Sequence, residues 1–143
     1  YGGNINYISL DLADRSSIKK FSEEVRLLHR KVDVLINNAG LMTSRRSLTS
    51  DGIEKQLAIN YLGHYYLTRL LLSSLCKSDR PRICNLASMA YNNVLHTGST
   101  AEVCLDFENM NWQQPGIAYN PDMAYSRSKL AIVLSTVQWA EVL

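Results

Sequence analysis

Apolar and polar positions follow one another along the chain in a pattern that predicts alternating strands and helices. The segment Asn4 to Leu10 alternates and ends in Asp11 and Leu12, which is typical of a short strand closing on a carboxylate. A helix is expected next, with Ser16 or Ser17 as its cap. Its inner stripe recurs at helical spacing: Ile18, Phe21, Val25 and Leu28.

The same order of strand and helix repeats twice more. A continuous apolar run, Lys31 to Asn37, is typical of a strand buried in a parallel sheet. The helix expected over Asp51 to Leu75 starts with an Asp cap and Glu54 three residues on, and it is apolar on nearly all sides. Arg82 to Ala87 is expected to form a third strand, and Tyr125 to Leu143 a last helix.

Three successive strand–helix units predict an α/β fold with a doubly wound parallel sheet, of which this chain would be a partial domain. Ligands of such sheets bind beyond the carboxyl ends of the strands. The predicted strands end in polar or small residues: Asp11, Asn37 to Gly40, and Ser88. These residues should therefore meet along one rim, where Tyr125 and Lys129 arrive from the last helix.

Tyr125 and Lys129 are four positions apart in that helix, so they project from the same face. A neighbouring ammonium favours the phenolate, which makes the pair a candidate general acid/base. Taken alone, the spacing is more often that of an ordinary surface helix, because Tyr-x-x-x-Lys recurs by chance. The spacing becomes informative here because polar residues at the ends of the predicted strands precede it in the sequence.

Composition excludes several functional classes. The 143 residues are 46% hydrophobic and 20% charged, and the net charge of +2 is scattered, which indicates one globular domain without a nucleic-acid surface. The three cysteines lack metal or disulfide spacing and are expected to be reduced, mostly buried thiols of an intracellular protein. His29 and His96 have no partner pattern, so no metal site is expected. No apolar run could span a membrane, and both ends look like cuts in a longer protein.

The chain resembles the short-chain dehydrogenase/reductases over nearly its whole length. The motifs that carry the resemblance stand in the family's order: Asp11-Leu12, Asn37-Asn38-Ala39-Gly40, Asn60, Ser88 and Tyr125-x-x-x-Lys129. A narrower likeness is to the retinol-dehydrogenase-like branch, through Thr49 to Glu54, Asn60 to Thr68, Tyr119 to Pro121, and Ser128 to Ala131. The resemblance implies the central part of one NAD(P)-binding, Rossmann-like domain over residues 1–143.

The resemblance also implies a catalytic role for each of four residues. Tyr125 would donate a proton to the substrate oxygen, and Ser88 would donate a hydrogen bond to the same oxygen. Lys129 would tune Tyr125 and hold the nicotinamide ribose, while Asn60 would join a water chain to Lys129. Ser88 could instead be a plain turn or cap residue, and Asn60 could mark a helix kink.

Cofactor-binding residues are implied in the same way. They are Asp11, Leu12, Asn37, Asn38, Ala39, Gly40, Tyr125 and Lys129. By family likeness Asp11 would accept from the adenine amino group, although it could be an ordinary helix-flanking carboxylate. Asn37 and Asn38 could merely close a turn, since Asn favours turns.

Two features depart from the family pattern. No Gly-rich turn opens a helix here, because Gly2 and Gly3 precede a predicted strand, so residues 1–143 alone are expected to bind dinucleotide poorly and to be inactive. Residues 89–121 make a long connection between Ser88 and Tyr125, expected to be an insertion near the substrate side.

The function that fits best is hydride transfer between NADP(H), or NAD, and the alcohol or carbonyl of an apolar substrate such as a retinoid, steroid or lipid aldehyde. NADP rests on the branch resemblance alone. The alternatives are a non-catalytic scaffold or pseudoenzyme, and a sugar-nucleotide epimerase, against which the Asn-Asn-Ala-Gly turn argues. His64 is expected to be a packing residue. A homodimer through the helices of 51–75 and 125–143 and a cytoplasmic or cytosol-facing membrane-associated location are also expected.

Overall fold

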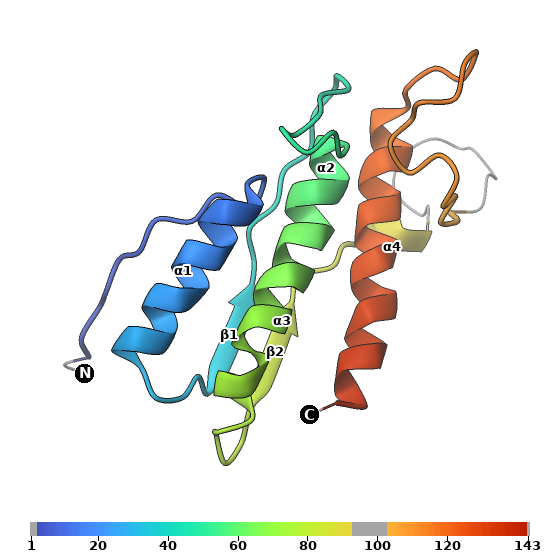
Figure 1. The fold of residues 1–143 in the computed structure, drawn as a ribbon. Helices are drawn as coiled ribbons and strands as arrows, with labels where there is room; N and C mark the ends of the chain where they lie inside the picture. Colours follow the sequence, from blue (N-terminus) through green and yellow to red (C-terminus); the bar gives the residue numbers. More distant parts are fainter. Residues whose placement is uncertain (1–2, 93–102, 143) are drawn as a thin grey trace.

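The computed structural model describes residues 3–92 and 103–142 and shows two parallel strands beside a layer of helices (Figure 1). The elements are, in order, α1 (Arg15–Leu28), β1 (Val34–Asn37), α2 (Lys55–Leu57), the π-helix η1 (Ala58–Leu62), α3 (Gly63–Leu75), β2 (Arg82–Asn85), the 3-10 helix η2 (Met89–Asn92) and α4 (Pro121–Ala140). β1 and β2 pair in parallel, from Val34 opposite Arg82 to Asn37 opposite Asn85. Because a parallel pair needs a crossover, here through α2, η1 and α3, the predicted α/β class is confirmed.

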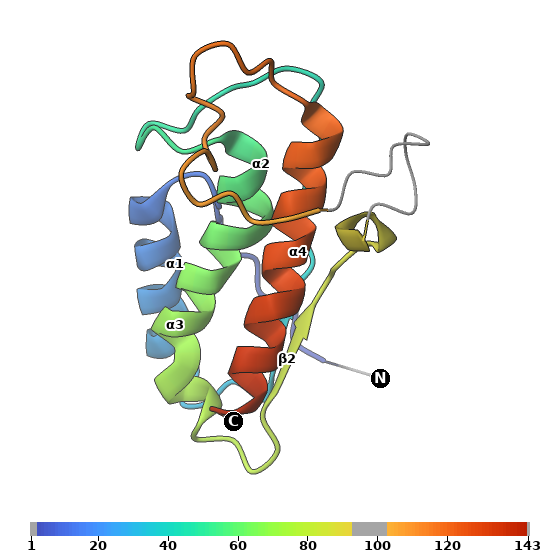
Figure 2. The same ribbon diagram turned by 90° about the vertical axis from the view of Figure 1, so that its right-hand side faces the viewer.

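The helices α1, α3 and α4 lie side by side over one face of the two strands (Figures 1 and 2). Ile18 of α1 and Leu67 and Leu71 of α3 form a buried cluster with Leu12, against which Leu35 of β1 packs. Full burial of one such side chain contributes about 1.5–3 kcal/mol. This cluster therefore fixes α1 and the chain before it onto α3.

The first predicted strand is not a strand in the structure. Residues 3–11 run as extended chain without a paired neighbour among the described residues, and Ile5 is 96% exposed. The alternating apolar and polar residues correctly predicted an extended chain (Figure 1). A strand, however, also requires hydrogen-bond partners for its backbone N–H and C=O groups. The strand predicted as buried, β1, is covered on one face only, since Ile36 is 62% exposed on the other.

Both predicted helix caps in the first half are wrong. Asp14 caps α1 by accepting from the N–H of Ser16 at 2.8 Å, ahead of the expected serines. Glu54, not Asp51, caps α2, because Gly52 turns the chain with φ +77° and delays the helix. In each case a carboxylate sits at the positive end of the helix, where it is favoured. The predicted inner residue Leu28 lies at the helix end and is 55% exposed.

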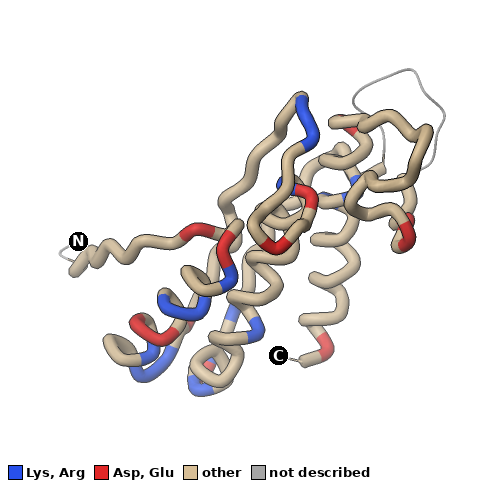
Figure 3. The backbone as a smooth tube through the Cα atoms, turned by 45° about the horizontal axis from the view of Figure 1, so that its top comes forward, with Lys and Arg blue, Asp and Glu red and all other residues tan. Residues whose placement is uncertain are grey.

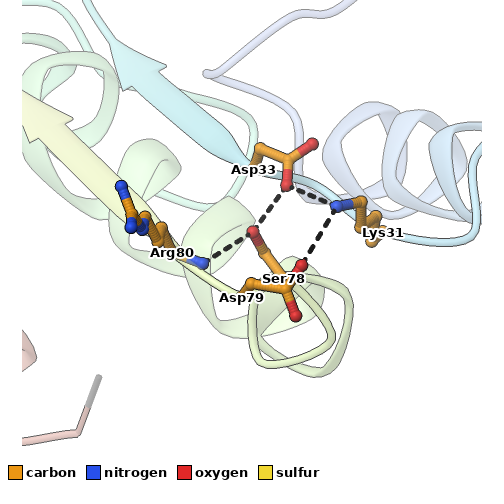
Figure 4. Close-up of polar contacts among 5 residues, drawn as sticks. All are labelled: Lys31, Asp33, Ser78, Asp79 and Arg80. Atoms are coloured by element: carbon orange, nitrogen blue, oxygen red, sulfur yellow. Dashed lines mark hydrogen bonds and ion pairs between the residues drawn. The ribbon is translucent and has the colours of Figure 1, made fainter.

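Hydrogen bonds and ion pairs link several polar residues beside the amino ends of the two strands (Figure 4). Ser78 donates to the carboxylate of Asp33 at 2.5 Å, and Lys31 makes an ion pair with Asp33 at 3.0 Å. The Ser78 hydroxyl, and then Lys31, lower the pKa of the Asp33 carboxyl. These exposed contacts shape the turn before β2 and lie at the end of the sheet opposite to the predicted rim.

The cysteines differ from the expectation of burial: Cys76, Cys84 and Cys104 are free thiols, and all three are exposed. Within the described residues, no helix is both long enough and apolar enough to cross a membrane.

Candidate active site

An open hollow of about 430 Å³ lies at the carboxyl ends of the two strands. Its walls come from the chain after β1, the chain after β2 and the first turns of α4: Asn38, Gly40, Leu41, Met42, Leu86, Ala87, Ser88, Tyr125 and Lys129. Parallel strands and the start of α4 thus bring together Ser88, Tyr125 and Lys129, which are up to 41 positions apart in sequence. Asn38 and Gly40 face the same space.

Lys129 is nearly enclosed, with 5% of the residue exposed. Its ammonium donates to the carbonyl of Leu86 at 2.8 Å and lies 5.5 Å from the centre of the Tyr125 ring. Desolvation lowers the pKa of Lys129. A cation at this place can stabilise a phenolate that forms beside it.

Ser88 lies three residues after the end of β2 and lines the hollow. Its hydroxyl oxygen accepts from the N–H of Ala90 at 3.3 Å. A hydroxyl that accepts one hydrogen bond still has its own proton to donate. Ser88 can therefore donate to a negatively charged or carbonyl oxygen placed between it and Tyr125.

Asn60 is fully buried in η1 and ties three segments together. Its side-chain oxygen accepts from the N–H of Leu41 at 2.8 Å, and its amide donates to the Leu41 carbonyl at 2.9 Å and to Ser128 Oγ at 3.0 Å. Ser128 in turn donates to the carbonyl of Tyr125 at 2.7 Å. Asn disfavours helix interiors, so these bonds offset its poor propensity and hold the loop after β1 against α4.

Gly40 lies close to Asn60 and Lys129. A Cβ at this position would lie 3.2 Å from the side-chain oxygen of Asn60, a tight contact, and 3.8 Å from the ammonium of Lys129, an ordinary one. The backbone after β1 therefore approaches Asn60 so closely that a larger residue would have to displace the Asn60 side chain slightly.

Four predicted cofactor residues are not among those that line the hollow: Asp11, Leu12, Asn37 and Ala39. Asp11 caps its own turn, accepting from the N–H of Ala13 at 2.8 Å, and Leu12 belongs to the core cluster. Asn37 points inward and donates to Thr68 at 3.1 Å and to Asn85 at 2.8 Å. Their cofactor roles stay predictions.

Sequence reasoning gave no role to Ser128 or to the backbone groups of Leu41 and Leu86, on which Asn60 and Lys129 depend. The signal for Ser128 was its place beside Lys129 in a motif. The backbone groups gave no signal, because any residue supplies the same N–H and C=O.

His64 was expected to pack beside the middle helix, and it is 7% exposed there. Its Nδ1 lies 3.0 Å from the carbonyl of Asn60. No group of three His, Cys, Asp or Glu within residues 3–92 and 103–142 could hold a metal ion, and His96 lies outside these ranges.

The second half of the predicted insertion, residues 103–120, is anchored to the start of α2; residues 93–102 lie outside the described chain. Tyr119 donates to the buried carboxylate of Glu54 at 2.9 Å and accepts from Gln56 at 2.8 Å. Asn111 accepts from the Glu54 N–H at 2.9 Å. Trp112 packs between Tyr119 and the guanidinium of Arg127, at 5.4 and 5.0 Å.

The pattern of the short chain dehydrogenase family matches residues 1–100. The chain belongs to this family. Human retinol dehydrogenase 13 is 43% identical over 93% of this chain, and human polyprenol dehydrogenase is 36% identical over 92%. The resemblance to the retinol-dehydrogenase-like branch is thereby confirmed. The matches cover 37% and 38% of those relatives, so this short-chain dehydrogenase chain spans little over a third of their length.

Solved structures agree on the fold. A crystal structure of an uncharacterized protein from Mycobacterium paratuberculosis matches with a TM-score of 0.71 at 36% identity, over 94% of this chain and 43% of the other. A metagenomic short-chain oxidoreductase in complex with NADP matches with a TM-score of 0.70 at 23% identity, over 99% and 55%. The chain is thus part of a Rossmann-like, doubly wound domain of a short-chain dehydrogenase.

Proposed function

We propose that the full-length protein interconverts an alcohol and a carbonyl with a nicotinamide dinucleotide, and that Tyr125 is its acid/base. The observation that carries the proposal is the common hollow of Ser88, Tyr125 and Lys129, with the Lys129 ammonium 5.5 Å from the Tyr125 ring. A carbonyl that accepts a hydride develops negative charge on oxygen, which requires a proton donor at that point.

The residues around the hollow fit a dinucleotide. The backbone of Gly40 lies close to the Lys129 ammonium. Within the described residues, Lys129 makes one hydrogen bond, to Leu86, so it has further N–H groups for ribose hydroxyls. Asn38 and Ala39 would border the bound dinucleotide, which supplies or accepts the hydride. We propose NADP over NAD from the likeness to the retinol-dehydrogenase-like branch.

The protein's own groups then have separate tasks. In the reducing direction, Tyr125 gives its hydroxyl proton to the substrate oxygen, while Ser88 holds that oxygen by donating a hydrogen bond. The Lys129 ammonium stabilises the phenolate that remains. Asn60 and Ser128 hold the backbone of Tyr125, so that the phenol keeps its place.

We propose an apolar substrate, of the retinoid, steroid or lipid-aldehyde type. Leu41, Met42 and Leu86 line the same hollow, and Met42 and Leu86 are 48% and 44% exposed. The relatives named for retinol and polyprenol support this class, since both compounds are long apolar alcohols. Free, exposed thiols at all three cysteines favour a reducing, cytosol-facing location.

Tyr125→Phe in the full-length protein tests the assignment. Turnover of retinal with NADPH should fall about 10²–10⁴-fold, the usual contribution of general acid catalysis, with dinucleotide affinity nearly unchanged because the ring remains. Tyr7→Phe, at a tyrosine that is 91% exposed, is the matched control and should keep full turnover. A Tyr125→Phe enzyme with wild-type turnover would overturn the role given to Tyr125.

A further inference from the structure

A second, much smaller cavity of about 10 Å³ lies deeper, between α3, α4 and the ends of the strands. Polar side chains line much of it, including Asn37, His64, Thr68, Asn85 and Ser135. This volume is at the lower end of what one water molecule occupies, and a polar lining is the setting in which such waters are retained.

The hydrogen bonds beside the cavity fix the orientation of the Asn37 amide. Thr136 donates its only hydroxyl proton to the carbonyl of Ile132 at 2.7 Å, so it must accept from the amide nitrogen of Asn85 at 2.9 Å. The Asn85 oxygen must then accept from the Asn37 nitrogen at 2.8 Å. With the Asn37 nitrogen acting as donor, its Oδ1 is a buried acceptor that receives no hydrogen bond from the described residues. Asn37 as a whole is 5% exposed.

His64 lines the same cavity and can supply a second acceptor. Its Nδ1 lies 3.0 Å from the Asn60 carbonyl, which can only accept, so Nδ1 carries the proton. Burial lowers the pKa of His64. The hydrogen bond to the Asn60 carbonyl raises this pKa and the charge of Lys129 lowers it, and the net effect is a lowered pKa, so the ring is neutral near pH 7. In that tautomer Nε2 is an acceptor.

We propose that one buried water molecule occupies this cavity and donates one hydrogen bond to Asn37 Oδ1 and the other to His64 Nε2. A water has two protons, which matches one acceptor on each of these two residues that line the cavity. The water fixes the plane of the imidazole, and Nδ1 then holds the carbonyl of Asn60, the residue that ties Leu41 to Ser128 and Tyr125. His64 is thus a positioning residue for the active site, a consequence that rests on the proposed function.

A high-resolution crystal structure of the full-length protein tests the water itself. One ordered water should lie within hydrogen-bond distance of both Asn37 Oδ1 and His64 Nε2. A cavity without a water, or a water that reaches only one of the two atoms, would overturn the proposal. This measurement is independent of whether the protein turns over any alcohol.

Two variants of His64 distinguish the role of its Nδ1 from the role of its Nε2. In His64→Asn the amide nitrogen replaces Nδ1 and keeps the bond to the Asn60 carbonyl, whereas in His64→Gln it replaces Nε2 and loses that bond. We expect kcat of His64→Asn within about threefold of wild type and kcat of His64→Gln about tenfold lower, the kinetic equivalent of one hydrogen bond, with KM for dinucleotide little changed in both.

Equal loss of kcat in the two variants would overturn the positioning role, because a residue that only fills space makes no such distinction. A wild-type protein without oxidoreductase activity would instead count against the proposed function, and the crystallographic result would still decide the water site.

Discussion

Lys129 lines the hollow although only 5% of the residue is exposed, and within the described residues no carboxylate pairs with its ammonium. The ammonium donates instead to the neutral carbonyl of Leu86. Burying a charge without a counter-charge opposes folding, which is why desolvation lowers the pKa of this lysine. A contribution to folding stability therefore does not explain the charge of Lys129.

Lys129→Met should accordingly stabilise the full-length protein while it impairs activity. Methionine keeps an unbranched apolar stem and removes the desolvation of the charge, so the urea midpoint at pH 7 should rise. Turnover should fall and dinucleotide should bind more weakly, because the phenolate and the ribose lose their cation. Lys20→Met, at an exposed lysine, is the control and should leave both properties unchanged. A lower urea midpoint for Lys129→Met would contradict this account.

The closeness of Tyr125 and Lys129, the proposed catalytic pair, could be predicted from sequence, because both belong to one helix and helix geometry alone puts them side by side. The role of Ser128 could not. Its partner Asn60 is 68 positions away, and only the packing of η1 against α4 brings the two side chains to 3.0 Å. Likewise, the inward orientation of Asn37 depends on Asn85, its neighbour in the sheet, and on Thr68 of α3, and no motif predicts either contact.

At the scale of the element, the helix over residues 55–75 is continuous, with its middle turn wound as a π-helix. Gly63, where α3 begins, packs against the carbonyl of Leu12; a Cβ there would lie 2.5 Å from that oxygen. This contact between backbone atoms lets the chain after residue 11 lie directly on the helix.

Gly63→Ala tests this contact, since helix propensity and packing predict opposite signs. Alanine is better than glycine in a helix by about 1 kcal/mol, whereas overpacking of a rigid core costs about 1–3 kcal/mol. Because the obstructing atom is backbone, we expect net destabilisation, measured by urea unfolding. Gly3→Ala, where a Cβ meets nothing within 4 Å, should be neutral. Stabilisation by Gly63→Ala would mean that the backbone of Leu12 moves aside freely.

The sequence predicted the existence and order of most elements but not where they begin. Apolar residues recur at helical spacing along the whole of α3 and α4, so the sequence alone is enough to recognise both helices. Helix starts depend on one side chain, and several polar residues compete for each. At α4 the helix begins at Pro121 with Asn120 as cap, four residues before Tyr125, because Asn120 accepts from the N–H of Met123 at 3.0 Å.

Residues 109–121 are coupled to α2 chiefly through buried polar groups. The Glu54 carboxylate, 1% exposed, accepts from Tyr119 and from the N–H groups of Gln56 and Leu57. Gln56 also donates to the carbonyl of Pro121 at 3.0 Å, which fixes the first turn of α4. The start of the helix that carries Tyr125 is thus held by this network.

Tyr119→Phe removes one donor to Glu54 and one acceptor for Gln56. Leaving buried polar groups unsatisfied costs about 1–3 kcal/mol, so the urea midpoint should fall accordingly. Tyr7→Phe loses a hydroxyl at an exposed position and should change the free energy of unfolding by less than about 0.5 kcal/mol. Equal effects of the two variants would show that the Tyr119 hydroxyl contributes nothing to anchoring the segment.

At the scale of the whole molecule, apolar side chains remain exposed on two sides. One is the face of β1 opposite the helix layer, at Val34 and Ile36; the other is the outer side of α4, at Leu134 and Val137. Charges of both signs are interspersed along the backbone and do not form a single-sign face (Figure 3). The homodimer through residues 51–75 and 125–143 stays a prediction, consistent with the exposed Leu134 and Val137.

The stability of the whole molecule should depend on pH through His64. Burial lowers the pKa of His64 below its ordinary 6.5, so below that pH the unfolded chain binds a proton that the folded protein does not. Stability is therefore full above about pH 6.5 and declines as the pH falls, by at most about 1.4 kcal/mol per pH unit for one proton. The lowered pKa of Asp33, from 3.8, acts only at more acidic pH, and that of Lys129, from 10.5, on the alkaline side.

Urea unfolding of the full-length protein between pH 5 and 7 should show this decline, compared with His64→Asn, which cannot titrate. The variant should have a shallower dependence of the urea midpoint on pH, whatever its absolute stability, because carboxylates common to both proteins contribute equally. Parallel curves for the two proteins would mean that His64 takes up its proton equally well in the folded and unfolded states. In that case the imidazole would have to be exposed to bulk solvent in the folded protein, contrary to the 7% exposure of His64 in α3.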